Sequence, residues 1–119
     1  MKTTPTETDR EAGRAFVPWP AMRVMWTATS RRWERIADGT AHTGHPFAID
    51  TDDPATVGCM VAQVEAAAGA PVELWHCPDD PPDAAHVVFV RDPSFEAFCG
   101  PTRGAALVAA KRALAEVAK

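Results

Sequence analysis

The clearest pattern of apolar and polar positions lies in the last twenty residues of the chain. Leu107, Ala110, Leu114 and Val117 recur at steps of three and four, which is the spacing of one buried helical face. Pro101 suits the first turn of a helix, where its missing N–H is no loss. The pattern predicts a C-terminal helix that packs on an apolar surface through Leu107, Leu114 and Val117.

A second helix is predicted over residues 54–68. Asp53 can accept hydrogen bonds from the first turn, Pro54 suits the first helical position, and Gly69 is placed to end the helix. The apolar residues of this segment mark one face: Val57, Met60, Val61, Val64 and Ala68.

Three strands are predicted between these helices, over residues 72–77, 86–90 and 95–99. Their short connections, including a tight turn at 91–94, favour an antiparallel meander. Residues 87–90 are an unbroken apolar run, typical of a strand covered on both faces. The predicted fold class is therefore α+β, a three-stranded antiparallel meander between helices (an α-β-β-β-α core) arranged as an α/β/α sandwich.

The N-terminal third is patterned less clearly. Residues 1–18 are polar and predict a flexible arm, although 7–16 could form a short helix weakened by Gly13. Residues 22–36 combine a helical spacing with strand-favouring residue types, so both interpretations stay open. Residues 39–49 predict a loop that ends in a short extended piece. We expect one domain over 1–119, folded from residue 19 onward.

Composition narrows the class of protein. The chain of 119 residues is 46% apolar and 24% charged, as expected of one small globular domain. No apolar run approaches the length of a membrane span, and the polar start lacks the pattern of a signal peptide. Three cysteines without paired spacing predict reduced thiols. These features predict a cytoplasmic protein that does not contact a membrane.

Charge varies along the chain. Residues 1–45 hold seven Lys or Arg and five acids, whereas residues 46–99 hold one Arg and ten acids. Because a surface with so few cations binds phosphate groups poorly, nucleic acid is disfavoured as a partner.

Several short motifs resemble those of the phage ABA-sandwich domain family, the NinX-like small phage proteins. They are Val24-Met25-Trp26, Trp33, Asp38-Gly39, Pro46-Phe47-Ala48-Ile49-Asp50 and Gly100-Pro101-Thr102, over roughly residues 22–117. The chain departs from the family pattern by lacking a Gly before its first motif Trp and by the added Thr51-Asp52-Asp53. The resemblance implies an ABA-sandwich fold and a phage or prophage source, with no active site to carry over.

Candidate catalytic and metal-binding residues form no strong pattern. His76, Cys77, His86 and Cys99 lack the paired spacing of zinc ligands, and Cys59 with His42 or His45 lies in an acidic region unsuited to a reactive thiolate. The acidic clusters at 50–53 and 79–83 lack the calcium-loop pattern and are typical of helix caps and turns. We therefore expect no catalytic residue, no metal and no cofactor.

A binding surface is the remaining hypothesis. Trp19 lies between two prolines, which favours an extended or turn conformation of the backbone, and it is the tryptophan that we expect to be exposed. Arg31, Arg32 and Arg35 form a basic patch beside Trp33. We expect a non-enzymatic interaction protein, a monomer or small homo-oligomer, that acts on a host or phage protein such as a component of host defence. The alternative is a small enzyme or nucleotide-binding protein that uses the His42–His45 loop and the sheet edge.

Overall fold

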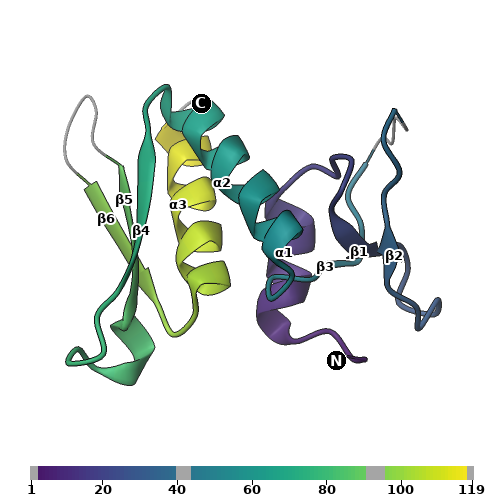
Figure 1. The fold of residues 1–119 in the computed structure, drawn as a ribbon, viewed down its shortest axis with the longest axis horizontal. Helices are drawn as coiled ribbons and strands as arrows, with labels where there is room; N and C mark the ends of the chain where they lie inside the picture. Colours follow the sequence, from purple (N-terminus) through teal and green to yellow (C-terminus); the bar gives the residue numbers. More distant parts are fainter. Residues whose placement is uncertain (1–2, 40–43, 91–95, 118–119) are drawn as a thin grey trace. The chain divides into compact units, whose positions relative to one another are not determined.

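The computed structural model describes residues 3–39, 44–90 and 96–117, without the side chains of 116 and 117. The described part is an α+β fold with three α-helices and two three-stranded antiparallel sheets (Figure 1). Its contacts group into two compact units, residues 1–59 and 60–119, where the sequence pattern predicts one domain. The boundary falls inside the second helix, α2 (Pro54–Ala68).

The first unit begins with helix α1 (Glu7–Ala15), which a capping box starts. The Thr6 side chain accepts from the Asp9 backbone N–H, and the Asp9 side chain accepts from the Thr6 N–H. Gly13 is needed for close packing, because an added Cβ would lie 2.6 Å from the Pro46 carbonyl oxygen. Phe16 is fully buried. Residues 7–15 therefore form an anchored helix, where the polar composition predicts part of a flexible arm.

Three short strands form the sheet of the first unit. They are β1 (Arg23–Met25), β2 (Glu34–Arg35) and β3 (Ala48–Ile49), paired antiparallel in the order β2-β1-β3. Helix α1 packs against β3. The structure therefore decides the open question over residues 22–36 in favour of strands. The short extended piece predicted at the end of the 39–49 loop is confirmed as β3.

Helix α2 begins and ends as predicted. The Asp53 carboxylate accepts from the Thr56 N–H at 3.0 Å and from its hydroxyl at 2.8 Å. At the other end, Gly69 has a positive φ of 68°, a conformation that glycine adopts without strain. The predicted boundaries of this helix are confirmed because both of its end signals are local in the sequence.

The second unit contains the predicted meander. Strands β4 (Val72–His76), β5 (His86–Val90) and β6 (Glu96–Gly100) pair antiparallel in the order β4-β5-β6. The Pro/Asp-rich connection between β4 and β5 includes a single 3₁₀ turn, η1 (Pro82–Ala84). The predicted turn at 91–94 lies outside the described residues.

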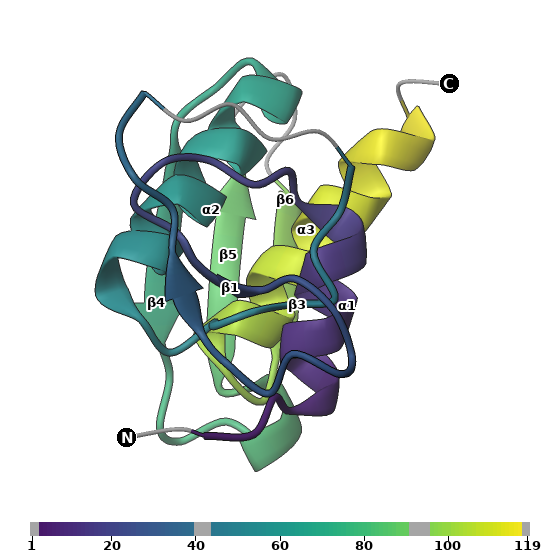
Figure 2. The ribbon, with the colours of Figure 1, turned by 90° about the vertical axis from the view of Figure 1, so that its right-hand side faces the viewer.

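Helix α3 (Arg103–Val117) lies along β5 and β6, as Figures 1 and 2 both show. Thr102 caps it by accepting from the Ala105 N–H, so the helix begins two residues after Pro101. Leu107 is fully buried and Leu114 is half-buried, while the Val117 side chain lies outside the described part. In the described ranges, no helix combines the length and apolarity that crossing a membrane requires.

The layers of the second unit differ in one respect from a sandwich with helices on both sides of the sheet. Helix α3 and the second half of α2 lie on the same side of the sheet β4-β5-β6 (Figures 1 and 2). The other side of the sheet therefore has no helix among the described residues of this unit. The apolar run in β5 suggests cover on both sides, and Val87 on the side away from α3 is only 6% exposed, with Trp75 and Cys99 as its partners on the neighbouring strands.

Candidate functional site

Trp19, the predicted hydrophobic anchor, lies in an ordered turn. Its backbone N–H donates to the Met22 sulfur at 3.1 Å, and its backbone carbonyl accepts from the Met22 backbone N–H at 3.2 Å. The turn includes Ala21 at a positive φ of 77°, and the Trp19 side chain is half-buried. Trp19 is thus less exposed than its proline-framed sequence suggests, and its role in partner binding stays a prediction.

Arg35 is engaged within its own unit. Its guanidinium makes a two-point contact with the Asp53 carboxylate, at 2.8 and 3.0 Å, and also donates to the Ala21 carbonyl. The hydrogen bond from Arg35, with those from Thr56, lowers the pKa of Asp53 from 3.8 to about 2. The same pairing raises the pKa of Arg35. Arg35 therefore holds the start of α2 and the turn after Trp19 together.

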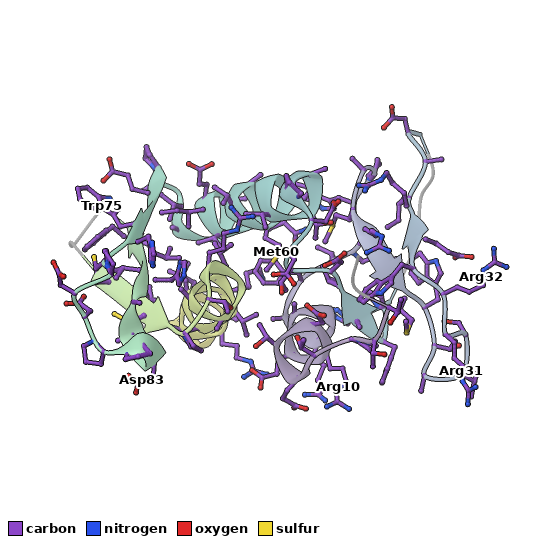
Figure 3. The ribbon with its side chains drawn as sticks, turned by 60° about the horizontal axis from the view of Figure 1, so that its bottom comes forward. Arg10, Arg31, Arg32, Met60, Trp75 and Asp83 are labelled. Carbon is purple, nitrogen blue, oxygen red and sulfur yellow. The ribbon has the colours of Figure 1, made fainter. Side chains whose placement is uncertain are left out.

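Arg31 and Arg32 are exposed on the connection between β1 and β2, and Figure 3 shows both projecting from it. The neighbouring Trp33 is half-buried, with the Arg23 guanidinium 5.2 Å from its ring centre. The structure thus divides the predicted basic patch. Arg31 and Arg32 face solvent, whereas Arg35 is used in an ion pair.

The histidine and cysteine residues of the second unit separate onto two faces. His76 and His86 are paired across β4 and β5 and stack with ring centres 4.4 Å apart, while Cys99 lies opposite Val87 on the other face. Burial, together with His76 and Arg103, lowers the pKa of His86. The described residues contain no group of three or more His, Cys, Asp or Glu that could hold a metal ion.

The Cys59 and His45 pairing considered for nucleophilic catalysis has no support in the geometry. Burial raises the pKa of the Cys59 thiol, which donates to the Pro20 carbonyl at 3.6 Å. The His45 ring instead contacts the Phe16 carbonyl at 3.1 Å, and His42 lies outside the described residues. Asp53 caps α2 and Asp50 accepts from the Asp52 N–H at 3.1 Å in the preceding turn, as predicted, and Asp50 also pairs with Arg23.

A different surface stands out in the second unit, on the side of the sheet away from α3. We call it the open face. Because paired residues of an antiparallel sheet point to the same side, the strand register defines its members: Glu73, Trp75, Val87, Phe89, Ala97 and Cys99.

Trp75 is the most prominent side chain of the open face. It is 53% exposed and meets the edge of the Phe89 ring, with ring centres 5.7 Å apart and planes at 84°. Figure 3 shows Trp75 pointing away from α3. Ala97 and Cys99 on the adjacent strand are also exposed. The open face is therefore mainly apolar and carries an exposed aromatic pair on β4 and β5.

The segment that forms the open face is acidic in composition. Residues 60–100 contain seven acids and one Arg, and Glu73 belongs to the face itself. The sequence pattern did hold a signal for this surface. In β4, Val72 and Leu74 alternate with Trp75 and Cys77, so both sides of the strand carry apolar residues. Only the placement of the helices shows which side is left open.

Comparisons with known proteins leave the chain without an assigned family. No family model, no curated protein and no solved structure matches it. The resemblance to the phage ABA-sandwich family therefore stays a prediction carried by its short motifs.

Proposed function

We propose that this chain is a small, non-enzymatic protein-binding module whose partner docks on the open face. The observation that carries the proposal is Trp75, a large aromatic side chain 53% exposed on the edge strand of an apolar sheet surface. Tryptophan is among the residues most enriched at the energetic centres of protein interfaces. Its edge contact with Phe89 limits its freedom, so little conformational entropy would be lost on binding.

The charge of the surrounding segment defines the chemistry of the partner. An apolar surface formed by an acidic segment is complementary to a protein surface that presents apolar residues framed by Lys or Arg. Such a partner would contact Trp75 and Phe89 through its apolar residues and would be attracted by the acids of residues 60–100. We therefore assign the open face to a basic protein partner.

The source of the partner is a further part of the proposal. The phage-like motifs favour a phage-encoded chain that acts in a bacterial cytoplasm on a host or phage protein, including one of a defence system. This part of the proposal rests on analogy of source, since shared folds do not by themselves transfer function.

The experiment compares the proteins captured from a bacterial lysate by the full chain and by two variants. Trp75→Ala removes the exposed aromatic side chain of the open face. Val17→Ala is the matched control, because Val17 is an exposed apolar residue, 46% exposed, in the first unit. Each captured protein is then purified and titrated against all three chains at low and high salt, and the mass of the free chain is measured by light scattering.

The proposal predicts a captured protein that binds the wild-type and Val17→Ala chains alike and loses tenfold or more in affinity for Trp75→Ala. Its affinity should also fall as salt rises, since salt screens attraction between a basic partner and acidic residues. Equal binding to Trp75→Ala would overturn the proposal. A homodimer that dissociates in the Trp75→Ala variant would also overturn it, because the open face would then be covered by a second copy.

A further inference from the structure

A pocket of about 350 Å³ lies within the first unit, apart from the open face. Two of its lining residues, Arg10 and Arg31, are cations, while Met25, Ala28 and Phe47 supply apolar lining. Residues 3–5 complete the lining, and none of the described residues that form it is an acid. The volume is within the range of small-molecule sites, which combine apolar walls with a few placed polar groups.

Arg10 brings an unsatisfied donor to this pocket. Its Nη2 donates to Glu7, but its Nε is buried and has no hydrogen-bond partner among the described residues. Buried donors in folded proteins are nearly always paired, so an unpaired one calls for an explanation. Because Nε itself is covered by protein, a ligand oxygen in the pocket would meet the exposed part of the guanidinium, whose side chain is 41% exposed.

Arg31 contributes a second unusual feature. It has a positive φ of 55°, a conformation that side-chain-bearing residues adopt uncommonly and that glycine would adopt freely. No hydrogen bond or ion pair involves its side chain among the described residues. Figure 3 shows Arg31 and Arg10 on the same side of the unit. An arginine at this position places an uncompensated positive charge on the pocket wall.

We propose that this pocket binds a small organic carboxylate that carries an apolar group. Guanidinium groups bind carboxylates through short, charge-assisted hydrogen bonds, and here they lie beside apolar surface. The carboxylate would contact the arginines while the apolar group lies against Met25 and Phe47. An inorganic anion would leave that apolar lining in contact with water, so it fits this pocket less well.

The test uses the full chain and five probes that separate the features of the ligand: octanoate, octanol, acetate, octyl phosphate and inorganic phosphate. Binding is measured by isothermal titration calorimetry and located by NMR shifts of Met25 and Phe47. We expect saturable binding of octanoate with shifts at both residues, and no saturation by octanol or acetate. Preference for octyl phosphate over octanoate would overturn the assignment to a carboxylate, as would equal binding of inorganic phosphate.

Two neighbouring arginines provide a matched pair of variants. Arg31→Gln and Arg32→Gln remove the same charge from the same exposed loop, but only Arg31 lines the pocket. We expect Arg31→Gln and Arg10→Gln each to weaken octanoate binding tenfold or more, and Arg32→Gln to leave it unchanged. Arg31→Gly, whose backbone favours a positive φ, should lose binding while it stays folded. Unchanged affinity in a folded Arg31→Gly or Arg10→Gln chain would overturn the proposal.

Discussion

Each of the two units of this protein is stabilised internally by a different kind of interaction. In the first unit the strands have two or three residues, and polar side chains join the segments: Asp9 with Thr51, Asp50 with Arg23, and Asp53 with Arg35. In the second unit the strands have five residues each and α3 covers the sheet with a buried apolar face. The first unit depends on specific side-chain hydrogen bonds, the second on backbone ladders and apolar packing.

This difference explains why the sequence predicts one unit better than the other. Backbone ladders and apolar faces leave periodic patterns that can be recognised from a single sequence. The buried Asp9, which accepts a hydrogen bond from a residue 42 positions away, leaves no such periodic pattern. In the sequence alone it cannot be distinguished from an exposed acid. The three predictions that follow test whether the two units respond to mutation in these two ways.

The largest expected effect is in the second unit. Leu107→Ala should lower the free energy of unfolding by about 2–5 kcal/mol, because the Leu107 side chain is fully buried, at 0% exposure. Leu114→Ala on the same helix should cost less, about 1 kcal/mol, since Leu114 is half-buried. Urea unfolding measures both. Equal losses, or a loss below about 1 kcal/mol for Leu107→Ala, would mean that α3 docks by another face.

The next effect belongs to the first unit. Asp9 is fully buried and accepts from the Thr6 N–H, the Thr51 N–H and the Thr51 hydroxyl. Asp9→Ala should cost about 2–3 kcal/mol, because it leaves these donors without their acceptor. Asp38→Ala, an exposed acid in the same unit, should change urea stability by less than about 0.5 kcal/mol. A similar loss of stability in the two variants would show that the hydrogen bonds of Asp9 do not stabilise this unit.

The smallest effect depends on pH. Arg35→Gln should lower stability at pH 7 by about 0.5–1 kcal/mol, a modest value because the Arg35 side chain is 49% exposed. The pKa of Asp53 is lowered from 3.8 to about 2 in the fold, so its pairing stabilises the protein above pH 3.8 and is lost as pH falls toward 2. The difference between Arg35→Gln and wild type should therefore shrink over that window.

Arg32→Gln is the control for this pH series, since Arg32 is exposed and, unlike Arg35, has no ion pair among the described residues. Its urea stability should match wild type at every pH. A difference between Arg35→Gln and wild type that stays constant from pH 7 down to pH 2 would contradict the assigned role of the ion pair with Asp53.

Local signals in the sequence were enough for much of the secondary structure. The cap at Asp53 and the stop at Gly69 set the bounds of α2, and the apolar run of residues 86–90 matches β5. These elements were predictable because capping, turn chemistry and strand propensity act within a few residues. Helix α1 shows the limit of local reasoning, because Gly13 lowers helix propensity but permits the close contact with Pro46.

The candidate sites required the tertiary structure. The sequence pattern predicted Trp19, Arg31, Arg32 and Arg35 as binding residues and favoured burial of the other tryptophans. Packing made Trp75 the exposed tryptophan, used Arg35 in an ion pair, and placed Arg31 with Arg10 in one pocket. Residue type and local pattern determine what a side chain can bind. Which side chains remain available is decided by contacts between segments distant in sequence, and those contacts leave no periodic signal in the chain.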